Sequence, residues 1–270
     1  MKKLFAAVLA LAMTASLAAC AGGNSSSSQA ASTSSEAQQS SSAASDSTAS
    51  QAEPATVLTH EEYMAAELDT QVTVETYVQA KQSWWEDKAT IYAQSEDGAY
   101  FIYDAACSEE LYEQLTPGTC IRVTGYKGEW SGEVEIMEGT IELVDAEPYT
   151  ATALDVTELL GTEELIDHQN ELVQFKGLTV EAAGQDDAGN DVAFLYNWDG
   201  SGTEGDDLYF NVSYNGETYT FTVESYLCDS SSEVYNAVKN LEIGETVDLE
   251  GFLYWYEGVN PHITSVTVVG

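Results

Sequence analysis

Eight aromatic side chains are the residues of this chain best suited to hold a ligand. They include all five tryptophans and lie in or beside segments that we expect to be loops: Trp84, Trp85, Tyr126, Trp130, Trp198, Tyr254, Trp255 and Tyr256. Aromatic rings offer flat apolar area with a polar edge, so they stack on sugar rings, on peptide side chains or on nucleobases. The alternative is that these rings fold back and close a small core.

Catalytic motifs are missing from the sequence. It contains no Gly-x-Ser-x-Gly elbow, no phosphate loop and no His-Glu-x-x-His. The three histidines, His60, His168 and His262, are scattered, and we interpret each as a surface or capping residue. The 46 acidic residues are too numerous for an acid–base pair to be singled out. We therefore expect a non-enzymatic protein without a cofactor, and a hydrolase is the weakest hypothesis.

Two acidic segments, 186–191 and 199–207, are the candidates for calcium binding. Neither keeps the alternating acidic ligands, central glycine and bidentate glutamate of an EF-hand loop. We interpret both as solvated turns and predict no metal site, with a calcium loop as the alternative.

The first 20 residues form an export signal. Lys2 and Lys3 precede the apolar run 4–17, which is too short to span a membrane. Leu17-Ala18-Ala19-Cys20 resembles the lipobox of bacterial lipoproteins, in which the cysteine becomes the acylated N-terminus. This resemblance implies lipidation of Cys20 and a protein on the cell membrane that faces the extracellular side of the envelope. An ordinary cleaved signal is the alternative.

Residues 21–55 form a Ser/Ala-rich stretch without aromatic residues. Such a composition buries too little apolar surface to offset its ordering entropy, so we expect a disordered stalk.

The charge balance of the chain limits the classes of partner that it can bind. Removing Lys2 and Lys3 with the signal leaves 6 basic residues against 46 acidic ones, a net charge of −40. Because nucleic-acid binders use Lys and Arg to displace counterions from phosphates, we expect no nucleic-acid partner. Solubility is the simplest interpretation of the charge.

A glycine spacing occurs twice. Gly118, Gly125 and Gly132 stand seven apart, and three more glycines, Gly244, Gly251 and Gly258, repeat the spacing at an offset of 126. Self-similarity at a fixed period indicates a duplicated structural unit.

Each copy has three strand patterns, a short helix and two further strands. The first copy has them at 72–78, 90–94, 99–103, 108–115 (helix), 119–126 and 133–144. The second has them at 172–181, 208–214, 218–223, 233–241 (helix), 246–253 and 259–268, with an insertion at 182–207 that carries an extra strand at 192–196. A capping box at Thr59 predicts a further helix through about Glu67.

This element order is that of the OB-fold, a five-stranded Greek-key barrel. At this level the chain resembles the tandem OB-fold lipoproteins of bacterial envelopes, a group of mostly unknown function. We therefore expect an all-β protein with short helices: a signal at 1–20, a linker at 21–55 and OB-fold-like domains at 56–147 and 148–270. A pair of immunoglobulin-like sandwiches is the alternative.

The remaining cysteines have two interpretations. Cys107 and Cys120 flank the helix of the first copy, and a disulfide between them suits an exported protein. Cys107 and Cys228 occupy similar positions in the two copies, which favours a packing role for both.

OB-folds bind ligands across strands 2 and 3, between the loops that join strands 1–2 and 4–5. The five tryptophans fall in or beside those loops. We therefore predict a lipid-anchored extracellular protein that binds a glycan or a peptide. The alternatives are a structural adaptor of an envelope assembly and, by fold analogy alone, nucleic-acid binding.

Overall fold

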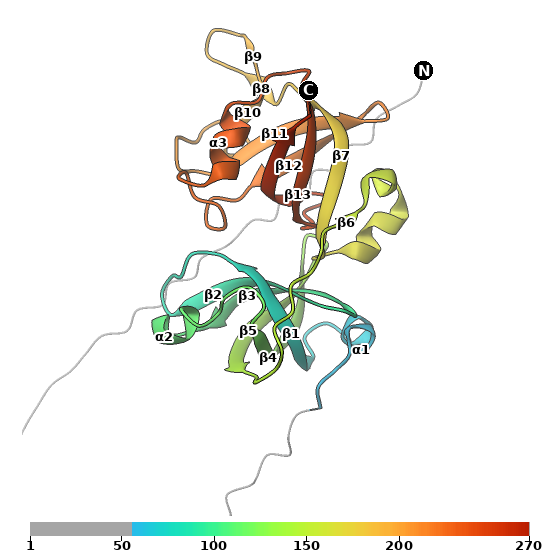
Figure 1. Ribbon diagram of the computed structural model, residues 1–270, viewed down its shortest axis with the longest axis vertical. Helices are drawn as coiled ribbons and strands as arrows, with labels where there is room; N and C mark the ends of the chain where they lie inside the picture. Colours follow the sequence, from blue (N-terminus) through green and yellow to red (C-terminus); the bar gives the residue numbers. More distant parts are fainter. Residues whose placement is uncertain (1–55, 270) are drawn as a thin grey trace, which may run out of the picture. The chain divides into compact units, whose positions relative to one another are not determined.

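The computed structural model describes residues 56–269, and the predicted signal peptide and linker lie outside this part. None of the described helices is long and apolar enough to cross a membrane. Two closed barrels with a few short helices account for most of the described chain (Figure 1). The predicted fold class is thereby confirmed, and the strands close into barrels rather than into sandwiches.

The first barrel closes in the order β1-β2-β3-β5-β4. Its elements are β1 (Gln71–Lys81), β2 (Lys88–Ser95), β3 (Gly98–Ala106), α2 (Glu109–Tyr112), β4 (Cys120–Trp130) and β5 (Glu133–Leu143). Strand β1 pairs with both β2 and β4, and β3 pairs in parallel with β5. Alternate residues such as Ile91, Ile102 and Val123 point inward and form its core, because successive side chains of a strand face opposite sides.

The second barrel repeats this order as β7-β11-β12-β14-β13, and a β11–β7 pairing closes it. Its elements are β7 (Leu172–Glu181), β11 (Leu208–Tyr214), β12 (Glu217–Val223), α3 (Glu233–Lys239), β13 (Thr246–Phe252) and β14 (His262–Val268). Phe175, Phe210 and Phe221 are among its largest buried side chains. Both copies therefore have the strand order expected of a duplicated OB-fold.

Short elements surround the two barrels. They are α1 (His60–Ala65), β6 (Leu154–Asp155), two 3-10 helices η1 (Thr157–Leu159) and η2 (Glu163–His168), the ribbon of β8 (Gly184–Gln185) and β9 (Asp191–Val192), and β10 (Phe194–Tyr196). The capping box at Thr59 is present, with its side chain accepting from Glu62 N–H. The single strand predicted at 192–196 is instead two strands in different sheets, because β9 pairs with β8 and β10 with β11.

The repeated glycines share structural roles. Gly118 and Gly244 have φ values of 89° and 93°, and each N–H donates to the carbonyl of a valine in the first strand of its barrel, Val78 or Val180, at 2.8 Å. Gly125 and Gly251 lie where the pairing of the last two strands shifts register. A Cβ at Gly251 would lie 2.8 Å from the Ile263 Cα and nearer still to the His262 carbonyl. The spacing thus marks two backbone features that a side chain would disturb.

Replacing Gly251 by alanine should lower the free energy of unfolding by about 1–3 kcal/mol, because the added Cβ collides with backbone that can move only with β14. Chemical denaturation measures the change. Ser265→Ala is the matched control, because Ser265 is exposed opposite Glu250 in the same ladder and should change stability by less than about 0.5 kcal/mol. A Gly251→Ala variant as stable as the parent would contradict this reason for the glycine.

Candidate ligand-binding surface

The eight predicted aromatic residues divide into three groups in the structure. Three tryptophans are strongly exposed: Trp85 (67%), Trp130 (60%) and Trp198 (76%). Tyr126 and Tyr256 are exposed to a smaller extent. Trp84, Tyr254 and Trp255 are half-buried. Five of the eight rings are therefore exposed, and two of these five, Tyr126 and Trp130, lie within β4 rather than in a loop.

The half-buried rings have identifiable partners. Trp84 Nε1 donates to the Cys107 carbonyl at 2.8 Å, which ties the β1–β2 loop to the end of β3. Tyr254 stacks on His262, with ring centroids 4.2 Å apart. A Cβ at Gly132 would lie 2.8 Å from Trp255 Cδ1, so the β13–β14 loop lies directly against the β4–β5 turn of the first barrel. These three rings stabilise the protein rather than present free faces.

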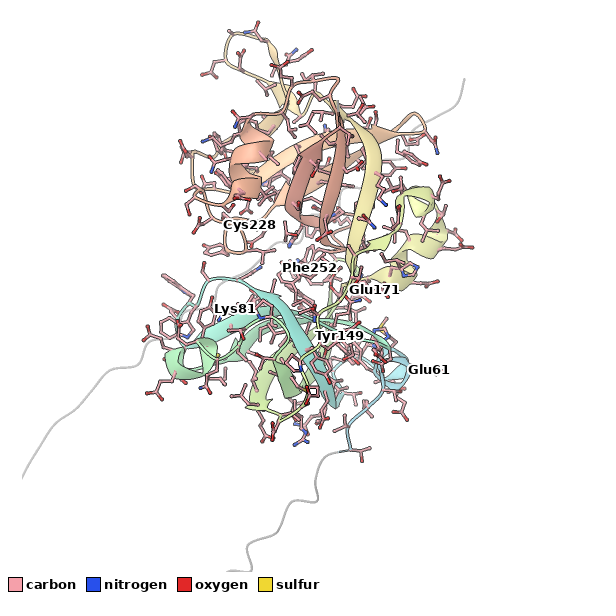
Figure 2. The ribbon with its side chains drawn as sticks, in the orientation of Figure 1. Glu61, Lys81, Tyr149, Glu171, Cys228 and Phe252 are labelled. Atoms are coloured by element: carbon pink, nitrogen blue, oxygen red, sulfur yellow. The ribbon has the colours of Figure 1, made fainter. Side chains whose placement is uncertain are left out.

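The strand 2–3 face of the first barrel is covered by the second barrel. Tyr92 of β2 and Phe101 of β3 are paired across the ladder and point outward. Phe252 stacks on Tyr92, with centroids 4.6 Å apart, and Leu172 packs against the same cluster. Phe252 is labelled in Figure 2. The expectation of an open ligand face in each barrel is therefore wrong for the first one.

His262 is buried at the centre of this contact, so its interpretation as a surface or capping residue is wrong. Its Nδ1 lies 2.5 Å from the Tyr92 hydroxyl, and burial lowers the pKa of His262 to about 3. The imidazole is therefore neutral at physiological pH. Such a ring joins the barrels by a hydrogen bond and an edge-on contact with the Tyr92 ring, without the cost of a buried charge.

A sequence signal for this covered face exists. Ala99-Tyr100-Phe101-Ile102 in β3 is apolar on both faces, and Thr90-Ile91-Tyr92-Ala93 in β2 is nearly so. Strands buried on both sides read as continuous apolar runs rather than as alternations. The corresponding segment of the second barrel, Asn211-Val212-Ser213, alternates.

The strand 2–3 face of the second barrel is polar and accessible. Its outward residues on β11 are Tyr209, Asn211 and Ser213, which face Thr222, Thr220 and Thr218 on β12. Thr218 and Thr220 are exposed, the three β11 side chains are half-buried, and Thr222 is buried. The predicted ligand face is therefore available in this barrel, where it presents hydroxyl and amide groups.

Hydrogen bonds hold this polar face in place. Thr220 Oγ1 donates to Asn211 Oδ1 at 2.8 Å, and Asn211 Nδ2 donates to the Ala182 carbonyl at the start of the long insertion. Thr222 Oγ1 donates to Asn260 Oδ1 at 2.7 Å, which connects the face to the β13–β14 loop. These three contacts link strands β11 and β12 to both flanking loops, so the polar groups are oriented in advance.

Acidic groups border the same face. Burial, together with Asp207, Glu224 and Tyr256, raises the pKa of Tyr209. Burial and the neighbouring Asp207 carboxylate raise the pKa of Glu224 to about 7. This edge therefore disfavours anions and tolerates neutral or cationic groups.

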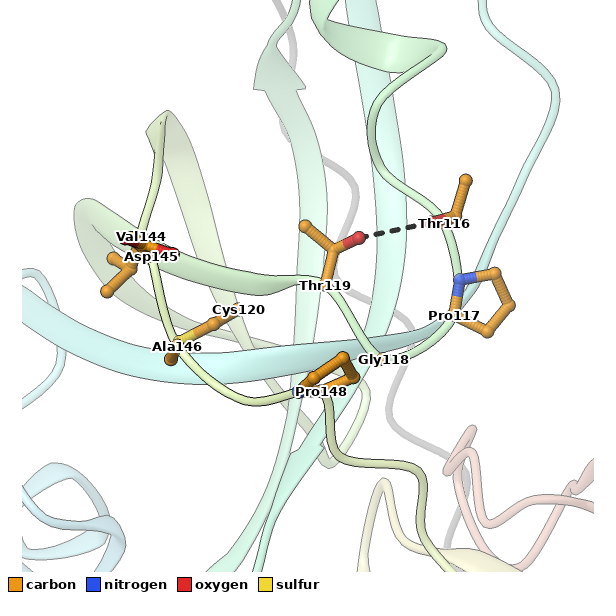
Figure 3. Close-up of a pocket in the computed structure, with 9 residues that line it drawn as sticks. All are labelled: Thr116, Pro117, Gly118, Thr119, Cys120, Val144, Asp145, Ala146 and Pro148. Carbon is orange, nitrogen blue, oxygen red and sulfur yellow. Dashed lines mark hydrogen bonds between the residues drawn. The ribbon is translucent and has the colours of Figure 1, made fainter.

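Two shallow cavities lie elsewhere on the first barrel. One of about 240 Å³ is lined by residues around Pro117 and Pro148 (Figure 3). The other, about 290 Å³, is lined by Asp69, Tyr126, Met137 and Glu138. Tyr126 is the one predicted ligand residue that lines either cavity.

Aspartate side chains of the two acidic loops accept hydrogen bonds from the backbone of their own loops. Asp186 Oδ1 accepts from the N–H groups of Ala188 and Asn190, and Asp199 Oδ1 accepts from Ser201 N–H. Among residues 56–269, no group of three or more His, Cys, Asp or Glu side chains is arranged to hold a metal ion. These loops are built as backbone turns.

The cysteines carry no disulfide in the described part of the chain. Cys107, Cys120 and Cys228 are free thiols. Cys107 belongs to the core of the first barrel, and Cys228 packs against the core of the second. This is the packing role that their similar positions indicate.

Comparison with known proteins assigns the chain to no protein family. No protein-family model and no curated protein sequence matches the chain. Solved structures with a similar arrangement include a hypothetical protein ygiW from E. coli (19% identity, 33% of this chain and 90% of that one, TM-score 0.25). They also include a p204 HINb domain (13% identity, 72% and 95%, TM-score 0.33) and a murine DNA binding protein bound with double-stranded DNA (10% identity, 73% and 96%, TM-score 0.33). With TM-scores below 0.5, these likenesses carry no argument about what this chain binds.

Phe252→Ala should lower the free energy of unfolding by about 3–5 kcal/mol, because it removes the ring that fills the contact between the barrels. Denaturant unfolding followed by fluorescence measures this. Tyr256→Ala, at an exposed position in the loop that follows β13, is the control and should stay within about 0.5 kcal/mol. Equal effects of the two substitutions would show that the covered face contributes no specific stability.

Proposed function

We propose that this chain is a lipid-anchored, non-enzymatic binding protein of a bacterial envelope, and that it recognises a neutral glycan through the second barrel. The observation that carries the proposal is the difference between the two strand 2–3 faces. The first is apolar and covered at Tyr92 and Phe101, whereas the second is polar and accessible at Asn211 and Thr220. The duplicated unit thus uses one face for assembly and leaves the other for a ligand.

The chemistry of the second face favours a sugar. Hydroxyl and amide groups on β11 and β12 are spaced along two paired strands, and sugar hydroxyls exchange hydrogen bonds with such groups. Trp198 in the loop before β11 and Tyr256 in the β13–β14 loop are exposed rings at the flanks. Rings beside polar groups suit the apolar face and hydroxyl edge of a pyranose. A peptide is the other ligand of this proposal.

The charge of the chain limits the ligand. A net charge of −40 for the chain without its signal opposes polyanions, because their counterions would be retained rather than released on binding. We therefore propose a ligand without phosphate, sulfate or uronate groups. The double-stranded DNA bound to the murine protein is a partner of that protein.

A second candidate function is an adaptor role in an envelope assembly. Trp85 in the β1–β2 loop and Trp130 at the end of β4 are exposed on the first barrel, whereas the polar face belongs to the second. Exposed tryptophans are enriched at protein–protein contacts. A protein partner on the first barrel would account for these two rings.

Screening the full chain against neutral glycans, peptides and a single-stranded oligonucleotide at low salt tests the proposal. Thr220→Val keeps the shape and removes the hydroxyl, so it should weaken glycan binding about tenfold, equivalent to one hydrogen bond of about 1.4 kcal/mol. Trp130→Ala is the control and should bind glycan normally. Binding of the oligonucleotide alone would overturn the proposal, and capture of a stoichiometric protein partner lost in Trp130→Ala would favour the adaptor.

The anchor is tested separately. Cys20 is the residue that the lipobox assigns to acylation, so Cys20→Ala should move the chain from the membrane fraction to the soluble fraction of cells. Mass spectrometry of the wild-type N-terminal peptide should show acyl chains on Cys20, two of which are needed for stable anchoring. An unmodified cysteine with the chain still on the membrane would refute lipidation.

A further inference from the structure

A carboxyl group without a cationic partner is buried between the two barrels. Glu133, the first residue of β5, is 0% exposed. None of the ion pairs among residues 56–269 includes it. Isolating an ionised carboxylate from water in this way is so costly that the group usually becomes neutral instead.

The two oxygens of Glu133 face two segments of the second barrel. Oε2 accepts from the backbone N–H of Trp255 at 2.9 Å. Oε1 has no hydrogen-bond partner. The side chain of Asn170, which precedes β7, lies beside the same carboxyl group, and its own Oδ1 also lacks a partner. The hydroxyl of Tyr63, whose pKa the charge of Glu133 raises, is likewise without a partner.

Two acceptors without donors are explained by one proton. One hydrogen of the Asn170 amide nitrogen is donated to the Val134 carbonyl at 3.2 Å, and Oδ1, which can only accept, has no donor. An ionised carboxylate has no hydrogen to donate, whereas a carboxylic acid has one. We propose that Glu133 is a neutral carboxylic acid whose Oε1–H donates to Asn170 Oδ1, so that one side chain of the first barrel holds two segments of the second.

The surroundings support this assignment. Burial raises the pKa of Glu133 to about 9. The charge of Glu135 affects the pKa of Glu133. The charge of Glu133 in turn affects the pKa values of Tyr63, Tyr92 and Tyr254. A negative charge on Glu135 opposes ionisation of Glu133, and burial raises the pKa of each of the three tyrosines, which are neutral hydroxyls. The contacts with Trp255 N–H and with the Asn170 side chain lower the pKa of Glu133, but burial outweighs both. No cation among these groups adds to them.

The proton makes the contact between the barrels sensitive to pH. In the unfolded chain Glu133 loses its proton near its ordinary pKa of about 4.5, whereas the folded protein keeps it up to about pH 9. The stabilising contribution is therefore complete below about pH 4.5, decreases as pH rises, and is lost above about pH 9. Unfolding at pH 7 releases this proton.

Glu133→Gln in the full chain tests the assignment. Glutamine is a neutral isostere that accepts from Trp255 N–H and donates to Asn170 Oδ1, so the variant should fold normally. Calorimetric unfolding at pH 7 in two buffers with different ionisation enthalpies counts protons. The parent should release one proton more on unfolding than Glu133→Gln. The melting temperature of the variant, relative to that of the parent, should increase as pH rises from 5 to 9. Glu129→Gln, at an exposed position on the preceding strand, should behave like the parent.

Infrared spectroscopy of the parent and the variant supplies a second readout. The carbonyl band of a protonated carboxylic acid should be stronger at pH 7 in the parent than in Glu133→Gln, where Glu224, with a pKa of about 7, still contributes. This difference between the two spectra should disappear above about pH 9. Equal proton release by parent and variant, or spectra at pH 7 without that difference, would overturn the proposal. A variant destabilised equally at pH 5 and pH 9 would also overturn it, because that result indicates a shape requirement rather than a proton.

Discussion

The contact of Phe252 with Tyr92 is the interaction on which the rest of this structure depends. It brings the end of β13 in the second barrel against the outward face of β2 and β3 in the first. Burial of aromatic rings makes the largest favourable contribution to the free energy of such a contact between domains. Around it, His262, Gln169 and Glu133 supply hydrogen bonds to the other barrel. These contacts cover the strand 2–3 face of the first barrel.

The two copies keep the same frame and differ in what they present. Equivalent glycine N–H groups bind Val78 and Val180 carbonyls, and residues with positive φ, Asp69 and Asn170, precede the first strand of each barrel. Their strand 2–3 faces have diverged, one towards tyrosine and phenylalanine, the other towards asparagine and threonine. One copy thus has its strand 2–3 face covered by the other barrel, and the other copy keeps this face accessible.

Much of the fold was predictable from the sequence because its determinants are local. Alternation of apolar residues identified β1 and β7, and the glycine spacing identified the duplication. The site was predictable only in part. Which outward face is covered depends on residues far apart in sequence, such as Tyr92 and His262, which are separated by 170 positions. Exposed and half-buried tryptophans are likewise indistinguishable by pattern, because Trp255 is held by the close approach of Gly132.

The central claim is that the second barrel covers the strand 2–3 face of the first. Nuclear Overhauser effects between aromatic ring protons of the full chain in solution test it most directly. The account predicts cross-peaks from the Tyr92 ring to the rings of Phe252 and His262, whose centroids lie 4.6 Å and 5.9 Å away. A spectrum in which Tyr92 has cross-peaks only to residues of its own barrel would contradict it.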